Sequence, residues 1–189
     1  MTLNKIRTLF ETKIVSQKYS MKKTVLLMLT LTMISCSNVQ KTEFSNEALS
    51  AKLLTVDRDN IPFSSLVEKH KGKILLIEVW ASWCGDCVKA MPKIQELQTN
   101  HPDVDYMFIS MDKTDDLWKE GIAKYDLKGE HFMAKDQMKG VFAKAIDLDW
   151  IPRYIIINKA GNIVLYRATE TDFDQINTTL KKLKKIEIN

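Results

Sequence analysis

The sequence predicts an α/β fold, a sandwich of three layers with a mixed central β-sheet. Residues 74–80 form a near-continuous apolar run, which is typical of a strand buried on both faces of a sheet. Apolar side chains recur every three residues over 88–97, which indicates one stripe along a helix. Two apolar stretches flank residues 158–162, a hairpin signal. Strands that alternate with helices and end in a hairpin favour this architecture.

The region before the first buried strand is predicted in three parts. Residues 37–50 are polar and lack a strong period, so we expect a tether between a leader and the folded domain, which spans 51–189. Residues 51–56 predict an edge strand that turns at 57–60. A short helix is expected over 62–70.

The region after the first buried strand continues the alternation. The patterns predict a helix over 85–99, a buried strand over 104–111, a helix over 115–125, a short strand over 131–134, a helix over 137–145, strands over 153–157 and 163–167, and a helix over 172–185. Pro92 falls inside the helix over 85–99 and should kink it.

The charge of the chain is unevenly distributed. The net charge is +4, but residues 1–36 carry six Lys or Arg and the single acid Glu11. Residues 37–189 therefore hold 22 basic and 23 acidic side chains. The basic excess belongs to the leader, so we infer no nucleic-acid partner from it. The lysine run over 181–185 is interpreted as the solvated face of the last helix.

The N-terminal region has the pattern of an export signal. Met21 is followed by two lysines, and the 12 residues 24–35 are uncharged and mostly apolar. This stretch is shorter than the about 20 residues that span a bilayer, but it suits the core of a signal peptide. We therefore predict a signal peptide over 21–36, with Met21 as the true start and 1–20 as an upstream extension of the reading frame.

The predicted signal peptide ends in a cysteine. Met33-Ile34-Ser35-Cys36 resembles a bacterial lipobox, in which the cysteine is lipidated and becomes the first residue of the mature protein. Small Ser35 fits this motif, whereas Met33 stands in place of the usual Leu. The prediction is a lipoprotein anchored through Cys36 on the periplasmic side of the bacterial cell envelope. The alternative is an ordinary signal peptide that leaves a soluble periplasmic or secreted protein.

A cysteine pair concentrates the chemistry at one place. Cys84 and Cys87 are separated by two residues, between the strand over 74–80 and the helix over 85–99. This arrangement predicts a thiol–disulfide redox centre. At a helix N-terminus, the dipole and free N–H groups should lower the pKa of the Cys84 thiol and make it the nucleophile. Cys87, one turn further, should be the buried resolving thiol. An inert buried pair is the alternative.

Several motifs together resemble the thioredoxin superfamily, in particular its membrane-tethered TlpA/ResA-like branch. They are the segment from Trp80 through Trp83, Cys84, Gly85 and Asp86 to Cys87, the helical Pro92, the segment from Trp150 through Ile151 to Pro152, and the hairpin over 154–164. The resemblance covers about residues 50–187. It implies a thioredoxin-like sandwich, a branch-specific insert between 114 and 136, and the activity of a thiol-disulfide oxidoreductase.

The resemblance also assigns a role to Glu78. This carboxylate lies six residues before Cys84 in an otherwise apolar strand, where it is costly unless it is hydrogen-bonded or protonated. The matching family position often holds a buried acid behind the second cysteine. Glu78 is therefore expected to accept the proton of Cys87, with its own pKa raised by desolvation. The alternative is a solvent-facing Glu78 at a strand edge.

The resemblance further implies that Pro152 follows a cis peptide bond, as in the family's cis-proline loop. Ile151 would then offer its N–H and C=O to an extended substrate strand. An ordinary trans proline is the alternative. Trp83 and Trp150 are expected to rim this site, whereas Trp80 and Trp118 are expected in the core.

Asp86 departs from the family pattern, which most often has Pro at this position. A negative charge close to Cys84 opposes the thiolate and raises the thiol's pKa. The reduced form is then less stabilised, so we predict a comparatively reducing couple.

The resulting prediction is an exported oxidoreductase that exchanges disulfides with cysteine-containing proteins, with reduction favoured. The redox-active dithiol would serve in place of a cofactor, and electrons would come from a membrane partner because no flavin or nicotinamide motif is present. A disulfide oxidase or isomerase is one alternative, and a metal-binding chaperone that uses the cysteine pair is another. No metal site is predicted, and His70, His101 and His131 are expected on the surface.

Overall fold

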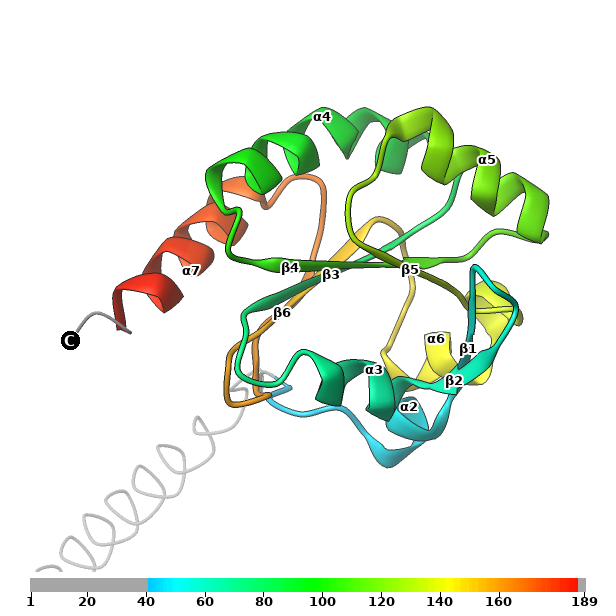
Figure 1. Ribbon diagram of the computed structural model, residues 1–189, viewed down its shortest axis with the longest axis horizontal. Coiled ribbons are helices and arrows are strands. Elements are labelled where there is room, and N and C mark those ends of the chain that lie inside the picture. The colour runs from blue at the N-terminus through cyan, green and yellow to red at the C-terminus, as the bar shows by residue number, and fades with distance from the viewer. Residues whose placement is uncertain (1–40, 187–189) are drawn as a thin grey trace, which may run out of the picture. The chain divides into compact units, whose positions relative to one another are not determined.

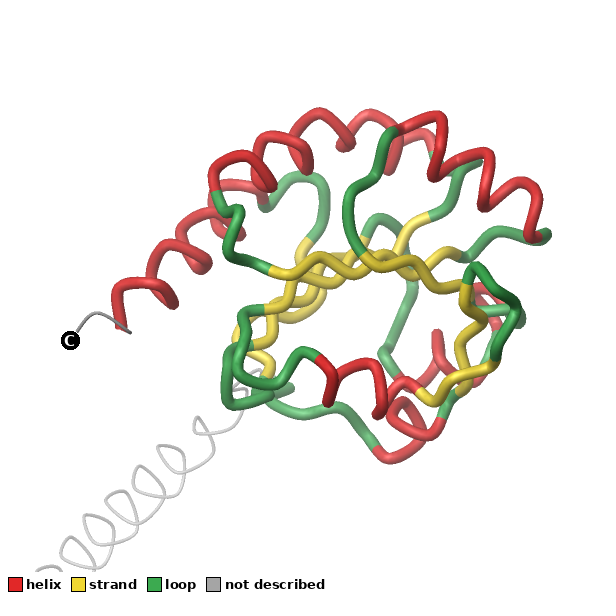
Figure 2. The backbone as a smooth tube through the Cα atoms, in the orientation of Figure 1, coloured by secondary structure: helices red, strands yellow, loops and turns green. Residues whose placement is uncertain are grey.

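A seven-stranded mixed β-sheet forms the middle layer of the protein, as the computed structural model shows (Figures 1 and 2). The structure describes residues 41–186. The upstream extension over 1–20, the signal peptide over 21–36 and its Cys36 lie outside the described residues. Along the sheet the strands follow the order β2-β1-β5-β4-β3-β6-β7. The strands span Lys52–Thr55 (β1), Asn60–Pro62 (β2), Leu75–Trp80 (β3), Asp105–Ser110 (β4), Glu130–Met133 (β5), Arg153–Ile157 (β6) and Ile163–Ala168 (β7).

Helices cover both faces of the sheet, which confirms the predicted α/β sandwich. In Figure 1, α4 and α5 lie on one face, and α2, α3 and α6 lie on the other. Helix α7 runs beside α4, because Lys93 sits 5.2 Å from the ring centre of Phe173 and His101 Nε2 lies 2.7 Å from Asn177 Oδ1. The helices span Asn46–Ser50 (α2), Phe63–Lys69 (α3), Gly85–Asn100 (α4), Asp115–Tyr125 (α5), Val141–Ala145 (α6) and Phe173–Ile186 (α7).

Strand β3 lies inside the sheet and sets the position of the site. It pairs parallel with β4 and antiparallel with β6. All six of its residues are buried, as its apolar run predicts. Since β6 runs antiparallel to β3, Val79 near the end of β3 faces Arg153 at the start of β6. The segment that follows β3 and the segment that precedes β6 therefore meet at the same end of the strands.

Large side chains from both faces fill the core. Trp80, Trp118, Tyr154, Phe63 and Phe108 are each less than 2% exposed. Burial of a large apolar side chain contributes about 1.5–3 kcal/mol to folding. No helix within residues 41–186 is both long enough and apolar enough to cross a membrane.

The expected tether is wrong from residue 41 onward. The Thr42 carbonyl accepts a hydrogen bond from the Ile163 N–H at 2.8 Å, and the Phe44 ring packs edge-on against Phe63 at 4.9 Å. Ser45 then caps the short helix α2, which buries Ala48. A few apolar side chains are enough to dock this polar segment, and five helical residues are too few to show a period.

Three smaller expectations also differ from the structure. Strand β1 is not at the edge, because β2 pairs outside it. The helix expected over 137–145 is a short 3-10 turn, Gln137–Lys139, followed by α6, because Gly140 between them is extended. His70 and His101 are buried, at 5% and 1% exposed, since each pairs with a polar side chain.

Candidate redox site

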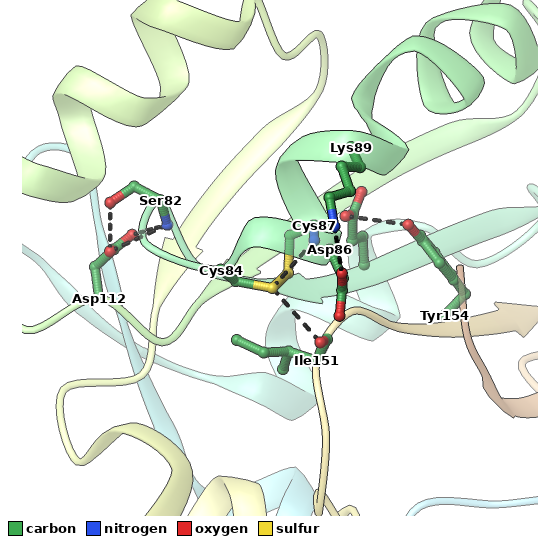
Figure 3. Close-up of a disulfide and its surroundings, with 9 residues drawn as sticks. Ser82, Cys84, Asp86, Cys87, Lys89, Asp112, Ile151 and Tyr154 are labelled. Atoms are coloured by element: carbon green, nitrogen blue, oxygen red, sulfur yellow. Dashed lines mark hydrogen bonds and ion pairs between the residues drawn. A yellow bond between two sulfur atoms is a disulfide. The ribbon is translucent and has the colours of Figure 1, made fainter. Parts of the chain in front are cut away.

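The cysteine pair lies where β3 passes into α4. Cys84 is the N-cap of α4, and its Sγ accepts a hydrogen bond from the Cys87 N–H at 3.1 Å. The two sulfurs form a disulfide, drawn in Figure 3, so the structure holds the oxidised pair. Cys84 is 6% exposed, whereas Cys87 is completely buried. An attacking partner therefore reaches Cys84 first, which fits the expected division into nucleophile and resolving thiol.

The segment before β6 lies against the disulfide. The peptide bond between Ile151 and Pro152 is cis, as predicted. The Ile151 carbonyl oxygen lies 3.5 Å from Cys84 Sγ, although the two residues are 67 positions apart. The antiparallel pairing of β6 with β3 brings them together. Their role in substrate binding stays a prediction.

A groove of about 390 Å³ opens over the disulfide. Trp83 and Trp150 line it and are 55% and 54% exposed, as expected for rim residues. Met138, which sequence reasoning did not single out, adds a thioether to the wall. The groove therefore presents apolar surface beside a reactive sulfur, which suits a polypeptide ligand.

Glu78 is fully buried in β3, so the alternative of a solvent-facing edge residue is wrong. The Tyr154 hydroxyl donates a hydrogen bond to Glu78 Oε1 at 3.3 Å. Glu78 Oε2 has no hydrogen-bond partner in the described part of the chain. Burial raises the pKa of Glu78 to about 8, and the Tyr154 hydrogen bond opposes this shift only in part. Burial and the neighbouring Glu78 raise the pKa of Tyr154 well above its usual value.

The position of Glu78 in the sheet shows which layer it faces. Side chains alternate along a strand, so Glu78 shares a face with Trp80, which packs edge-on against α5. Tyr154, its hydrogen-bond partner, packs on Phe173 of α7 at 5.3 Å between ring centres. Glu78 therefore points into the helical layer that contains Cys87.

Asp86 lies in the first turn of α4, next to the disulfide. Its carboxylate forms an ion pair with Lys89 at 3.3 Å, one turn along the helix. Both side chains are substantially exposed, so water screens the pair. The sequence pattern did not single out Lys89. Its positive charge partly offsets the negative charge of Asp86, and therefore the effect expected of Asp86 on Cys84.

A second buried carboxylate escaped sequence reasoning. Asp112 is 0% exposed and accepts hydrogen bonds from Ser82 and Ser110. Asp112 follows β4, which runs parallel to β3, so the carboxyl ends of both strands lie at the same end of the sheet. An acid directly after a buried strand, at the same end as the cysteine motif, was the available signal.

The histidines within residues 41–186 contact other side chains and do not gather with further ligand residues. That part of the chain contains no group of three or more His, Cys, Asp or Glu side chains that could hold a metal ion. His70 Nδ1 instead lies 2.6 Å from Asp105, and His131 stacks on Phe108.

Comparison with known proteins agrees with this geometry. A family model described as thioredoxin-like matches residues 72–163. The thiol-disulfide oxidoreductase ResA of Bacillus cereus (strain ATCC 10987 / NRS 248) is 26% identical over 149 residues, which are 78% of this chain and 82% of that protein. Thioredoxin-1 of Caenorhabditis elegans is 33% identical over 66 residues, which cover 35% of this chain and 54% of that protein.

Solved structures resemble the fold as a whole. A thiol-disulfide oxidoreductase from Bacteroides fragilis NCTC 9343 has a TM-score of 0.60 at 21% identity, over 70% of this chain and 95% of that one. A secreted disulfide oxidoreductase of Mycobacterium tuberculosis has a TM-score of 0.54 at 16% identity, over 73% and 99%. At these identities the likeness concerns the fold alone.

Proposed function

Because this chain belongs to the thioredoxin-like family and is a thiol-disulfide oxidoreductase, we propose that it reduces disulfides in exported proteins through Cys84 and Cys87. One observation carries this proposal: Cys84 caps α4 beneath an apolar groove, with the Ile151 carbonyl 3.5 Å from its sulfur. The helix terminus favours a thiolate there, and the groove offers room for the partner polypeptide.

The reaction begins from the reduced pair. The Cys84 thiolate attacks one sulfur of a substrate disulfide, which forms a mixed disulfide and releases the other substrate sulfur as a thiolate. Cys87 then loses its proton and attacks Cys84 Sγ, which releases the second substrate thiolate and closes the Cys84–Cys87 disulfide. Two electrons pass to the substrate, and the state described above is the product form of the enzyme.

Glu78 is proposed as the proton acceptor for Cys87. Its pKa of about 8 lies close to the about 8.5 of a free cysteine thiol, so a proton can pass between them in either direction at little cost. The unpartnered Oε2 provides a lone pair for that proton. The burial that raises this pKa also keeps solvent from the carboxylate.

The direction of electron flow rests on charge. Asp86 in the first turn of α4 opposes the Cys84 thiolate and so makes the couple more reducing. A disulfide oxidase is the second candidate, because the ion pair with Lys89 offsets part of that negative charge. The equilibrium of the pair with glutathione separates the two: a strongly oxidising couple would favour the oxidase.

The setting proposed for this activity is the periplasmic side of the bacterial cell envelope, with Cys36 as the lipid attachment. The substrates are cysteine-containing proteins, and a membrane partner supplies the electrons that regenerate the dithiol. The signal-peptide pattern over 21–36 supports this location. Labelling the expressed protein with a fatty acid tests the anchor, and Cys36→Ser should abolish the label.

A trapping experiment tests the activity. Cys87→Ala removes the resolving thiol, so targets should accumulate on Cys84 as mixed disulfides that a reductant releases. A double variant that also carries Cys84→Ala is the matched control and should capture nothing. If Cys87→Ala collects no cysteine-containing envelope proteins, the proposed function is wrong.

A further inference from the structure

A buried carboxylate lies behind the loop that carries the nucleophilic cysteine. Ser82 donates to Asp112 twice: its hydroxyl lies 2.7 Å from Oδ1, and its N–H lies 3.2 Å from each carboxylate oxygen. The Ser110 hydroxyl donates to Oδ2 at 2.7 Å and accepts the Asp112 N–H at 2.9 Å. We propose that Asp112 is a positioning residue that fixes the redox loop, residues 81–84, and biases the cysteine couple toward its disulfide.

The redox loop is held at Ser82 from two directions. In Figure 3, the side chains of Asp112 and Ser82 point toward each other beside the disulfide. Helix α5 also packs closely against Ser82, because a Cβ added to Gly121 of this helix would lie 2.9 Å from Ser82 Cβ. The Cys84 N–H also donates to the Ala81 carbonyl at 3.1 Å, which closes the loop as a turn. Ser82 is therefore the point at which the sheet and α5 together set the position of Cys84.

The hydrogen bonds suit a charged carboxylate. Both oxygens of Asp112 face donors, namely the Ser82 amide and two serine hydroxyls. Isolation from solvent is costly for a charge unless such donors compensate it, and here they do. Because the site is buried, its field reaches Cys84 with less screening than the field of an exposed acid.

The charge of Asp112 should shift the equilibrium between the dithiol and disulfide forms of Cys84 and Cys87. A negative charge near Cys84 disfavours the thiolate, and therefore the reduced form, relative to the disulfide. The dithiol then gives up electrons more readily. This inference deepens the proposed reductase function and rests on the same cysteine pair.

Asp112→Asn tests the charge. The amide oxygen can still accept from Ser82, and the amide nitrogen can donate to Ser110, so the loop should stay in place. We expect the pKa of Cys84, read from thiolate absorbance, to fall, and the glutathione equilibrium to shift about tenfold toward the reduced pair. Asp116→Asn, which removes an exposed charge from α5, should change neither quantity. A folded Asp112→Asn protein with an unchanged equilibrium and only a lower Tm would overturn the proposal.

Ser82→Ala tests whether the hydrogen bond to Asp112 positions the redox loop. It also provides the test of the proposal if Asp112→Asn does not fold. It removes one hydrogen bond and leaves the charge. We expect Cys84 to form mixed disulfides about fivefold more slowly with the glutathione equilibrium unchanged. Ser65→Ala, at an exposed serine of α3, should keep the wild-type rate. A wild-type rate in Ser82→Ala would overturn the positioning role.

The two proposals fail in different experiments. If Cys87→Ala traps no proteins while Asp112→Asn still shifts the glutathione equilibrium, the proposed function fails and the role of Asp112 stands. If trapping succeeds while Asp112→Asn behaves as wild type, the role of Asp112 fails alone.

Discussion

Glu78 and Tyr154 face each other on the antiparallel strands β3 and β6, and the Tyr154 hydroxyl donates to Glu78 Oε1 at 3.3 Å. Both side chains are completely buried. Tyr154 lies two residues after Pro152, so the strand that brings the cis-proline segment to Cys84 also supplies the partner of the buried acid. The pairing of β3 with β6 thus organises both the groove side of the disulfide and the surroundings of Glu78.

Glu78→Gln should slow resolution of the mixed disulfide. The substitution keeps the shape of the side chain but removes the proposed proton acceptor, so we expect attack by Cys87 to slow by about tenfold to hundredfold near neutral pH. Rapid mixing with a mixed disulfide between Cys84 and a small thiol measures this rate. Glu68→Gln, at an exposed glutamate of α3, serves as the control. Resolution at the wild-type rate in Glu78→Gln would remove the assignment.

Tyr154→Phe should raise the pKa of Glu78 above its value of about 8. The Tyr154 hydrogen bond favours the charged carboxylate, and the substitution removes it. The inflection in the pH profile of resolution should move upward accordingly. Tyr166→Phe, whose hydroxyl bonds to the Ile146 carbonyl, is the control and should leave the inflection in place. A downward shift in Tyr154→Phe would contradict a hydrogen bond from Tyr154 to the Glu78 carboxylate.

The raised pKa of Glu78 makes stability depend on pH. Below about 4.5 the carboxyl holds its proton in both the folded and the unfolded chain. Between about 4.5 and about 8 the unfolded chain ionises while folded Glu78 stays neutral, so the folded state binds more protons. The free energy of unfolding from this group should therefore fall as pH rises through that window, by on the order of 5 kcal/mol, and then level off.

Urea unfolding of the oxidised protein at a series of pH values measures this dependence. The difference between wild type and Glu78→Gln isolates the contribution of Glu78 from the other titrating groups. A difference that does not change across the window would show that Glu78 is not neutral in the folded protein at neutral pH.

Asp86 and Lys89 should shift the couple in opposite directions. Asp86→Asn removes a negative charge near Cys84 and should favour the reduced pair in the glutathione equilibrium. Lys89→Gln removes the partner cation and should favour the disulfide. Because both side chains are exposed to water, we expect only about twofold to threefold changes. Lys119→Gln on α5 is the control, and shifts of the same sign in Asp86→Asn and Lys89→Gln would rule out a charge effect.

Trp150→Ala should weaken protein capture without weakening the fold. The indole is 54% exposed, so its removal should change the free energy of unfolding by less than about 0.5 kcal/mol. The yield of protein adducts in the Cys87→Ala background should fall, while reduction of glutathione disulfide stays at the wild-type rate. Val141→Ala removes an apolar side chain that is 60% exposed and does not line the groove, and it should leave both unchanged. Equal loss with the small and the protein substrates would point to damage at Cys84 itself.

The predicted elements agree with the structure where the sequence pattern is long and local. The apolar run of β3 and the helix Asp115–Tyr125 follow from periodicity alone, and the cysteine motif falls at the junction of β3 with α4 as expected. Short segments failed: five helical residues at Asn46–Ser50 carry too little period to be recognised. The break at Gly140 depends on one backbone conformation that the apolar spacing does not encode.

The sequence by itself determined the cysteine pair and its place at a helix N-terminus, because Cys84 and Cys87 lie within one turn of chain. It also indicated Glu78 through the cost of a lone acid in an apolar strand. Only the tertiary structure decided which distant groups surround them. Ile151 is 67 residues from Cys84 in the chain, Tyr154 is 76 residues from Glu78, and Asp112 is 30 residues from Ser82. The physical reason is strand pairing: β6 antiparallel to β3 and β4 parallel to it deliver these groups to one end of the sheet, and no local pattern records that pairing.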